Sequence, residues 1–498
     1  MLTRRTLLGA STGAVALAAL RPAFAHADAP WTQLRSHLTG TLVLPGESAY
    51  ATAKQLEQTQ FDTTNPQAIA YCAGPTDVTL CLLFAQDNDI PVAVRSGGHS
   101  LGGYSTTTGL IIDVSRLDSI TLSGSSATFG PGAHNVDLLT TLAPSGLAVT
   151  GGACPTVAAG GFVQGGGLGF LTRPLGMACD ALTSARLVLA DGRQVTASEK
   201  KNSDLFWAIR GGGGGNFGVV TSYTVTPSAV TDVATATLVF SYDKALDMID
   251  GYVNWLADAP RTIGGACVVT LADAAAGAVP VPAIRLISTG TAAELTDELG
   301  RLLALTGQPV VRQEAVMPYS TLMMGVYGCA TKTTEQCHRV DVSPEGQLTR
   351  PEFGLERSRM FTAPIARNAW ASALAVFDAD RRAGQIHQLQ VLPLGGADSD
   401  LARCDTAYVH RDSLYTTNYL STIPTAATDE ARAAARAWVD RGFAAIDPYS
   451  GGETYQNFID PALTDWKSSY YAENYPRLAA TKAAYDPYRV FSFAQGIR

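Results

Sequence analysis

The sequence carries little charge for its length. Charged residues make up 16% of the 498 positions, against about 25% in an average soluble domain, and 36 basic and 44 acidic side chains leave a net charge of −8. It has no long run of lysine and arginine. Because nucleic-acid binding depends on clustered cations that neutralise phosphates, this composition argues against nucleic acid as a partner.

Histidine is also scarce. The seven histidines are scattered along the chain, which contains neither an HExxH motif nor a closely spaced histidine pair. A zinc site whose ligands are neighbours in the sequence needs such spacing. We therefore predict no metal site.

Long apolar segments are absent beyond the N-terminus. There, Arg4 and Arg5 precede an apolar run over residues 7–20, which is too short to span a bilayer and is followed by small residues. This pattern predicts a cleavable signal over residues 1–29 of the twin-arginine type, with an ordinary secretory signal as the alternative. We expect a secreted or periplasmic protein that meets the twin-arginine export machinery only transiently and keeps no membrane anchor.

The eight cysteines of this chain raise the question of disulfides, which persist outside the cytosol. Cys329 and Cys337 flank a short polar loop that one bridge would close, and they are the best candidates. Cys267 and Cys404 form a possible second pair, since sequence alone does not fix connectivity.

Glycine, in contrast, is abundant. Many of the 48 glycines lie in three blocks, over residues 97–103, 151–169 and 211–218, and each block adjoins short strand-like segments. Backbone N–H groups reach a phosphate most easily where no Cβ intervenes, although each block alone also fits a tight turn. Three such blocks in one chain favour one extended ligand.

The third block contains the GxGxxG pattern of dinucleotide-binding folds, at residues 213–218. In those folds a helix follows the pattern directly and points its N-terminus at the pyrophosphate. Here residues 219–225 have the composition of a strand. The context therefore argues against a nicotinamide-dependent dehydrogenase, which stays an alternative.

The chain exceeds the length that one core usually serves, so we expect two domains after the signal. A helix is predicted from Pro75 to about residue 85, followed by strands at 92–94 and 110–114. From about 228 to 440 the glycine blocks give way to longer segments rich in alanine, threonine and valine. Near the end of that stretch Thr428 is the expected N-cap of a helix.

Several motifs occur together in an order known from one family. They are RSGGHS at 95–100, GACPTV at 152–157, the glycines of 160–167, DLFWAIRGGGGGNFGVV at 204–220 and YQN at 455–457. On these motifs the chain resembles the berberine bridge enzyme-like group of FAD-linked oxidases, within the vanillyl-alcohol oxidase superfamily. The resemblance runs from about residue 60 to the end and is looser in the middle.

The resemblance implies an α+β fold. Residues 30–227 and 441–498 would form a two-part FAD-binding domain, and residues 228–440 a substrate-binding domain whose antiparallel sheet, covered by helices, lies over the flavin. It also implies covalently bound FAD. His99 would bond to the methyl carbon on the flavin's dimethylbenzene ring, and Cys154 would form a thioether to the neighbouring ring carbon.

The resemblance assigns further residues to the cofactor: Arg95, Ser96, Gly97, Gly98, Ser100, Val157, Gly160, Gly161, Gly165, Gly166, Gly167, Asn216, Val219 and Asn457. Val157 matches the family position where a small residue leaves molecular oxygen room to reach the reduced flavin, whereas bulkier residues accompany dehydrogenases. Many relatives carry a histidine where this chain has Phe162, which puts in doubt any polar contact of that histidine near the cofactor.

The implied reaction is oxidation of a hydroxyl-bearing carbohydrate or a glycosylated or other secondary metabolite, with hydride transfer to FAD and reduction of oxygen to hydrogen peroxide. Tyr455 is the expected base, and it needs a nearby cation or donor because a free phenol has a pKa near ~10. Strand alternation places Gln388 and Gln390 on one face, where they suit substrate hydroxyls, and His387 on the other. A flavin dehydrogenase with another acceptor and a non-catalytic extracellular binding protein stay open as alternatives.

Overall fold

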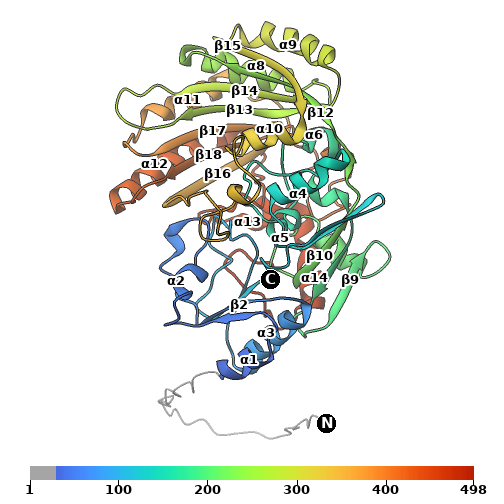
Figure 1. Cartoon of the computed structure of the whole chain (residues 1–498). Helices are drawn as coiled ribbons and strands as arrows, with labels where there is room; N and C mark the ends of the chain where they lie inside the picture. Colours follow the sequence, from blue (N-terminus) through green and yellow to red (C-terminus); the bar gives the residue numbers. More distant parts are fainter. Residues whose placement is uncertain (1–29) are drawn as a thin grey trace, which may run out of the picture.

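The computed structural model describes residues 30–498, so the predicted signal over residues 1–29 lies outside the described part of the chain. The described residues form two parts, one above the other in Figure 1. The lower part contains two small sheets, a two-stranded ribbon and the C-terminal end of the chain. The upper part contains one large sheet with helices on its outer side.

The first sheet of the lower part has four strands in the order β1-β2-β4-β3. They are β1 (Thr41–Val43), β2 (Ala68–Tyr71), β3 (Val92–Arg95) and β4 (Leu110–Asp113), with helices α1 (Trp31–His37), α2 (Tyr50–Ala53) and α3 (Pro75–Asp87). Strands β2, β3 and β4 run parallel, and α3 connects β2 to β3. Pro75 occupies the first turn of α3, which confirms the predicted helix start. Strands β3 and β4 confirm the two strands predicted after it.

The second sheet of the lower part is antiparallel, with five strands in the order β5-β6-β10-β8-β9. They are β5 (Ile120–Ser123), β6 (Ser126–Phe129), β8 (Leu182–Val188), β9 (Gln194–Ser198) and β10 (Val219–Val225), and a separate ribbon pairs β7 (Leu147–Ala148) with β11 (Ser228–Ala229). The third glycine block leads directly into β10, as predicted. The chain therefore lacks, at this point, the helix that a nicotinamide fingerprint requires.

Besides α1 to α3, the lower part contains helices from the N-terminal and the C-terminal segments of the described chain. They are α4 (Asn135–Leu142), α5 (Ala159–Gln164), α6 (Thr172–Leu175), α7 (Ser203–Ala208), α13 (Trp466–Tyr471) and α14 (Tyr475–Tyr485). Helix α14 packs on α7, and Tyr470 and Leu478 share one hydrophobic core with Phe206 and Trp207. The C-terminal segment thus completes the domain that the N-terminal segment begins.

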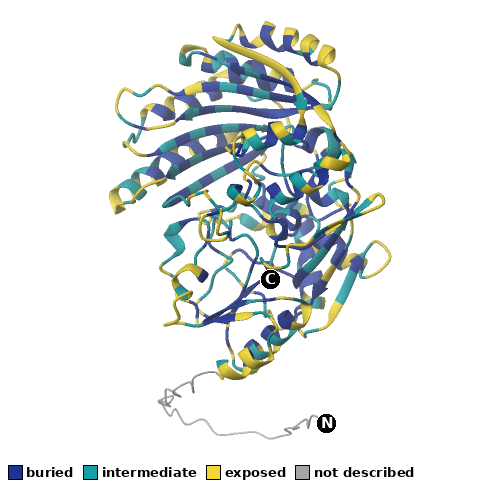
Figure 2. Cartoon of the chain, in the orientation of Figure 1, coloured by how far each residue is buried: buried dark blue, intermediate teal, exposed yellow. Residues whose placement is uncertain are grey.

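The upper part is an antiparallel sheet of seven strands in the order β15-β12-β14-β13-β17-β18-β16. The strands are β12 (Asp232–Val239), β13 (Ile263–Leu271), β14 (Val281–Ser288), β15 (Val311–Pro318), β16 (Phe353–Phe361), β17 (Ile386–Pro393) and β18 (Tyr415–Ile423). The central strands are buried, whereas the edge strand β15 is exposed (Figure 2). The sheet and its helices confirm the predicted α+β class.

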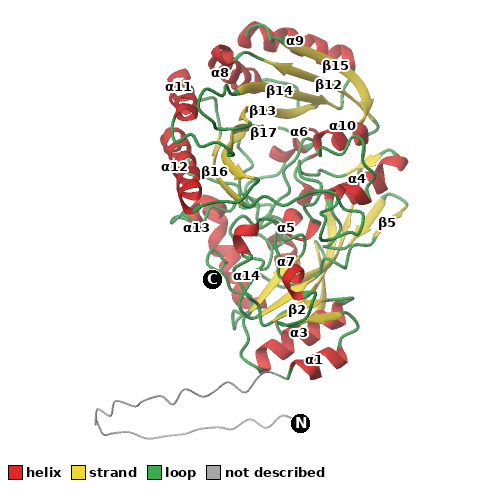
Figure 3. Cartoon of the chain, turned by 60° about the vertical axis from the view of Figure 1, so that its left-hand side comes forward, coloured by secondary structure: helices red, strands yellow, loops and turns green. Residues whose placement is uncertain are grey.

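Four helices cover the outer face of this sheet (Figure 3). They are α8 (Ala245–Leu256), α9 (Ala292–Thr306), α11 (Arg367–Ala375) and α12 (Asp429–Ile446), while α10 (Tyr319–Val326) lies against α4 of the lower part. The Thr428 hydroxyl accepts a hydrogen bond from the backbone of Ala431 at 3.2 Å, so Thr428 is the N-cap predicted for α12. The inner face of the sheet is left to face the lower part.

The cysteines divide into one close pair and several isolated thiols. The sulfur atoms of Cys329 and Cys337 lie at disulfide distance, with Cα atoms 5.8 Å apart. Cys267 is buried in β13 and Cys404 is exposed in a loop, and both are free. The possible pairing of Cys267 with Cys404 is therefore wrong, because the two residues belong to different layers of the fold.

The helices within residues 30–498 all lack the combination of length and apolar character that a membrane span requires.

Candidate active site

A cavity of about 1080 Å³ lies between the glycine-rich loops of the lower part and the inner face of the large sheet. Its volume exceeds the roughly 300–1000 Å³ of sites for drug-sized ligands, so it has room for an extended ligand. All three glycine blocks contribute to its lower wall, together with residues 455–459 near the C-terminus. Strands β13, β16, β17 and β18 form its roof.

The three glycine blocks meet because they lack side chains. A β-carbon added at Gly97 would lie 2.9 Å from the backbone nitrogen of Ala158, so the first block touches the second. A β-carbon at Gly214 would lie 3.5 Å from the Cα of Gly161, so the third block touches the second as well. At Gly161 itself an added β-carbon would meet nothing within 4 Å, which leaves its backbone open toward the cavity. This bare backbone wall suits the phosphates of a dinucleotide.

Unsatisfied polar atoms also line the cavity. The hydroxyls of Ser105 and Thr106 and the side-chain oxygen of Gln456 are buried and have no hydrogen-bond partner among the described residues. Buried polar groups are nearly always paired, so unpaired ones at a cavity wall indicate a polar ligand. The glycine wall and these atoms together fit FAD.

His99 projects from the first glycine block into this cavity. Its Nε2 lies 2.9 Å from the Thr156 hydroxyl and 3.5 Å from the Oε2 atom of Glu57. Burial lowers the pKa of His99, so its imidazole is neutral at physiological pH. A carboxylate only accepts hydrogen bonds, which favours a proton on Nε2 and leaves the lone pair of Nδ1 free.

Cys154 lies two residues from Thr156 and also lines the cavity with a free thiol. The Cys154 side chain is exposed toward the cavity, and desolvation by the surrounding protein, aided by the charges of Glu57 and Glu356, raises the pKa of its thiol to about 11. Asn135, in the first turn of α4, donates a hydrogen bond of 3.0 Å to the Cys154 carbonyl and fixes the loop. His99 and Cys154, the two predicted attachment residues, thus approach one cavity from adjoining loops.

Tyr455 enters the cavity from the C-terminal segment. Its phenolic oxygen accepts hydrogen bonds from the backbone N–H groups of Gly167 and Leu168, at 2.8 and 3.1 Å, and from the Asn457 amide at 2.9 Å. Burial raises the pKa of Tyr455, and these three donors oppose that effect. A neutral phenol oxygen has two lone pairs and a phenolate has three, so the three donors lower the pKa of Tyr455 relative to burial alone, although its pKa still lies above the usual value.

Phe162 does not disturb this arrangement. Its carbonyl accepts a hydrogen bond of 2.9 Å from the Asn457 amide, which any residue type at position 162 would allow. Its ring lies beside Gly152 and Gly167. The absent histidine therefore costs the site no contact with Asn457.

The roof of the cavity contains one of the two predicted substrate residues. Gln390 lines the cavity, and its amide donates to Gln388 at 3.1 Å, whose own amide donates to Thr270 at 3.1 Å. Gln388 belongs to the same face but supports Gln390 instead of lining the cavity. On the opposite face His387 stacks on Trp438, with ring centroids 4.1 Å apart. The predicted alternation of this strand is confirmed.

Sequence reasoning missed Glu356, which lines the cavity from β16. It lies opposite Leu420 of β18, which in turn lies opposite Gln388, so the three side chains share the inner face. Burial raises the pKa of Glu356 to about 8. A carboxyl with such a pKa in a cavity is a candidate acid or base, and its only signal in the sequence is an acidic residue inside a strand.

The predicted cofactor residues fall into two groups. Those that line the cavity are Ser96, Gly97, Gly98, His99, Ser100, Cys154, Val157, Gly160, Gly161, Asn216 and Asn457. Those that lie behind its wall are Arg95, Gly165, Gly166, Gly167 and Val219. Arg95 forms a buried ion pair with Asp113, and a β-carbon at Gly165 would overlap the Asn457 side chain. These residues position the wall from behind.

The sequence matches family models near both of its ends. Residues 66–198 match a model described as an FAD binding domain, and residues 454–498 match one described as berberine and berberine like. YgaK of Bacillus subtilis strain 168, named as an uncharacterized FAD-linked oxidoreductase, is 28% identical over 477 residues. That match covers 93% of this chain and 98% of YgaK.

Solved structures share the fold. BBE-like 1 of Physcomitrella patens aligns with a TM-score of 0.83 at 23% identity, covering 94% of this chain and 98% of that one. Glucooligosaccharide oxidase of Acremonium strictum, described with a 6-S-cysteinyl, 8α-N1-histidyl FAD, aligns with a TM-score of 0.80 at 22% identity, covering 92% of this chain and 97% of that one. Both alignments span the lower and the upper part of the fold.

Proposed function

Because this chain belongs to the berberine bridge enzyme-like FAD-linked oxidoreductases, we propose that it is an oxidase whose FAD is bound covalently through both His99 and Cys154. One observation carries the proposal. Both residues line a single cavity that also contains Tyr455 on its lower wall and Gln390 on its roof. The same kind of double attachment is named for the glucooligosaccharide oxidase that shares the fold.

The residues of the lower wall would hold the cofactor. The bare backbones at Gly161 and Gly214 suit its phosphates, and the free Nδ1 lone pair of His99 and the Cys154 thiol suit its ring system. When bound, FAD supplies the acceptor for a hydride from the substrate. Attachment at two points keeps the cofactor on a protein that works outside the cell.

We assign removal of the substrate's hydroxyl proton to Tyr455. The three N–H donors around its oxygen stabilise the phenolate, which is the form of Tyr455 that can accept this proton. Glu356 is the second proton-accepting group at the cavity. Its pKa of about 8 lets it take up or release a proton near neutral pH, so we place it as a partner that binds the substrate and buffers the transferred proton.

The substrate we propose is a carbohydrate, or a glycosylated or other secondary metabolite, that carries an oxidisable hydroxyl. Gln390 offers amide donors and an acceptor at the roof, and Glu356 adds a carboxyl, so the roof matches several hydroxyl groups at once. Val157, a small residue at the cavity wall, leaves room for oxygen, so we propose hydrogen peroxide as the second product. A dehydrogenase with another acceptor is the alternative for this half of the reaction.

Residues 1–29 support the further proposal that the protein is exported by the twin-arginine route to the periplasm or the medium. The measurement is the N-terminal sequence of the protein recovered outside the cytoplasm, with and without Arg4→Lys and Arg5→Lys. A mature protein that begins near residue 30, and is retained inside the cell by the double variant, supports this route.

The test of covalent attachment is the intact mass of the denatured mature protein. We expect the mass of one FAD on the wild type and on His99→Ala and Cys154→Ala, and no FAD on the double variant. An unmodified wild-type protein from a flavin-replete host would contradict the proposal and favour a non-catalytic binding protein. Peroxide release on a panel of oligosaccharides and glycosides then separates an oxidase from a dehydrogenase, which would turn over only with an added acceptor.

A further inference from the structure

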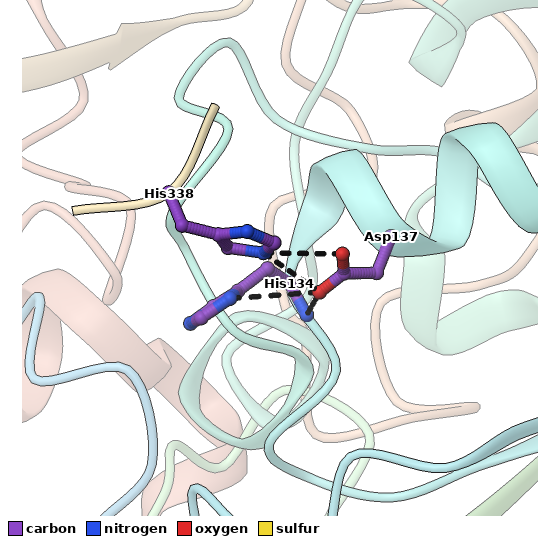
Figure 4. A group of neighbouring side chains, drawn as sticks. All are labelled: His134, Asp137 and His338. Carbon is purple, nitrogen blue, oxygen red and sulfur yellow. Dashed lines mark hydrogen bonds and ion pairs between the residues drawn. The ribbon is translucent and has the colours of Figure 1, made fainter. Parts of the chain in front are cut away.

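Two histidines and an aspartate come together outside the cavity. His134 and Asp137 belong to the N-terminal end of α4, and His338 comes from a loop about two hundred positions later in the chain (Figure 4). The Nε2 atom of His338 lies 3.1 Å from Oδ1 of Asp137, and the Nδ1 atom of His134 lies 3.5 Å from Oδ2. The three ligand atoms all lie within 4.8 Å of one another.

The two nitrogen-to-oxygen distances, 3.1 and 3.5 Å, are close to the ligand spacing of a tetrahedral zinc site. Zinc bonds to histidine nitrogen and carboxylate oxygen are about 2.0–2.1 Å long, which places neighbouring ligand atoms about 3.3 Å apart. Imidazole and carboxylate are also the ligand types that zinc accepts, and three protein ligands leave a fourth position for water. The side chains of His134, Asp137 and His338 are 13%, 25% and 13% exposed. An ion can therefore reach them from solvent, while the surrounding protein restricts the movement of the three side chains.

The ring of His338 is oriented from its other side. Its Nδ1 lies 3.3 Å from the carbonyl oxygen of Glu335. A carbonyl oxygen only accepts, so this contact keeps a proton on Nδ1. Nε2 faces the Asp137 carboxylate, so a bound cation would displace the proton from Nε2 and take its place between the two side chains. Such a contact to the second nitrogen is typical of histidines that bind metals.

We propose that His134, Asp137 and His338 bind one divalent cation, for which zinc is the best match. The ion adds no new covalent step and replaces the direct contact between His338 and Asp137 with two metal bonds. Its role is structural, because it joins α4 to the loop that follows Cys337.

The two sides of this metal site lead to the two proposed attachment residues. On the α4 side, Asn135 holds the carbonyl of Cys154 at 3.0 Å. On the loop side, Arg339 lies 3.7 Å from Glu57, whose carboxylate is 3.5 Å from His99. A bound ion would therefore fix the relative position of the loops that carry Cys154 and face His99.

The experiment uses the purified holoprotein with any affinity tag removed, depleted of metal by dialysis against a chelator. Cobalt(II) is the probe, because tetrahedral cobalt absorbs at longer wavelengths than flavin, and zinc is then added as the competitor. We expect one cobalt per chain, displaced by one zinc, and a higher thermal midpoint with zinc than without it. The variants are His338→Ala and Asp137→Asn, with His37→Ala as the matched control because His37 is exposed on α1, far from this cluster in the sequence.

We expect His37→Ala to bind metal as the wild type does, and His338→Ala to lose at least about 100-fold in affinity, since even residues that only orient a ligand cost 10–100-fold. Asp137→Asn should lose binding too. Because Asp137 also caps α4 through the backbone nitrogen of His134, His338→Ala is the variant that decides the matter if Asp137→Asn fails to fold. Equal cobalt binding by wild type and His338→Ala, or no thermal response of the wild type to zinc, overturns the proposal and leaves an ordinary ion pair.

Discussion

Glu57 lies 3.5 Å from His99, carboxylate oxygen to imidazole Nε2, and that same oxygen has no hydrogen-bond partner among the described residues. Its other charged neighbour, Arg339, is 3.7 Å away. A partly buried carboxylate beside a neutral histidine orients the ring and draws the proton to the nitrogen that faces it. The opposite nitrogen, Nδ1, is then the one available for a bond to the cofactor.

Replacement of Glu57 by glutamine should slow attachment of FAD at His99. The ring gains positive charge as Nδ1 forms its bond, and an amide cannot take up the Nε2 proton that a carboxylate accepts. Opposite charges this close at a partly buried site attract by about a few kcal/mol, and the amide dipole recovers part of that, so the rate should fall by about 10- to 100-fold. The measurement is the rise of FAD-modified mass after FAD is added to apoprotein, in a Cys154→Ala background where His99 is the single remaining attachment.

The control for this experiment is Glu47→Gln, since Glu47 is on the surface, where it pairs with Arg35 and accepts a hydrogen bond from the backbone nitrogen of Leu44. It should attach FAD at the wild-type rate. An unchanged rate in Glu57→Gln would show that the contact merely packs the loop. If Glu57→Gln no longer contains FAD and its thermal midpoint is also lower, the variant has a folding defect instead.

Tyr455→Phe should reduce kcat while the protein keeps its FAD. The phenol oxygen is the point on which three donors converge, and phenylalanine removes that oxygen while it preserves the ring. General bases contribute about 10²- to 10⁴-fold, so we expect a loss in that range with KM nearly unchanged. The rate of flavin bleaching by substrate without oxygen measures this step directly. Wild-type bleaching by Tyr455→Phe would transfer the role to Glu356.

Those parts of the fold that depend on neighbours in the sequence were predictable. Pro75 and Thr428 mark helix starts because each acts within one turn, and the period-two pattern placed Gln390 and His387 on opposite faces of β17. The strand after Gly218 followed from its β-branched residues. Each of these signals lies within a few residues of the feature that it predicts.

Features that depend on distant strands or loops were not predictable from local patterns. Glu356 reaches the cavity because β16 pairs with β18, and the residues around Glu356 do not reveal this order of strands in the sheet. His134 and Asp137 are two members of the proposed metal-binding cluster, but the third, His338, is about two hundred positions away in the sequence. The prediction of no metal site rested on local spacing and did not include residues this far apart. Arg95 belongs to a conspicuous motif, yet a buried partner, Asp113, turns it away from the cavity.

Glu356 should make the protein less stable as pH rises. Its pKa is about 8 in the folded protein and near 4.5 in an unfolded chain, so the folded state holds this proton more tightly. Stability is therefore lost from about pH 4.5 up to about pH 8, by an amount on the order of 4–5 kcal/mol if no other group compensates. Glu356→Gln carries no titratable proton at this position. Its thermal midpoint should therefore rise relative to that of the wild type as pH is raised from 5 to 8. A constant difference across that range would contradict the buried, protonated state of Glu356.

Val157→Leu should convert the protein from an oxidase toward a dehydrogenase. Val157 lines the cavity on the loop that carries Cys154. If the protein is the proposed oxidase, a larger side chain there would fill the space by which oxygen reaches the cofactor. We expect reoxidation by oxygen to slow at least about tenfold, equivalent to about 1.4 kcal/mol of barrier, while anaerobic reduction by substrate keeps its rate. Stopped-flow absorbance measures the two half-reactions separately, and Val157→Ala is the control that enlarges the passage. If Val157→Leu reoxidises as fast as the wild type, oxygen takes another route and Val157 serves packing alone.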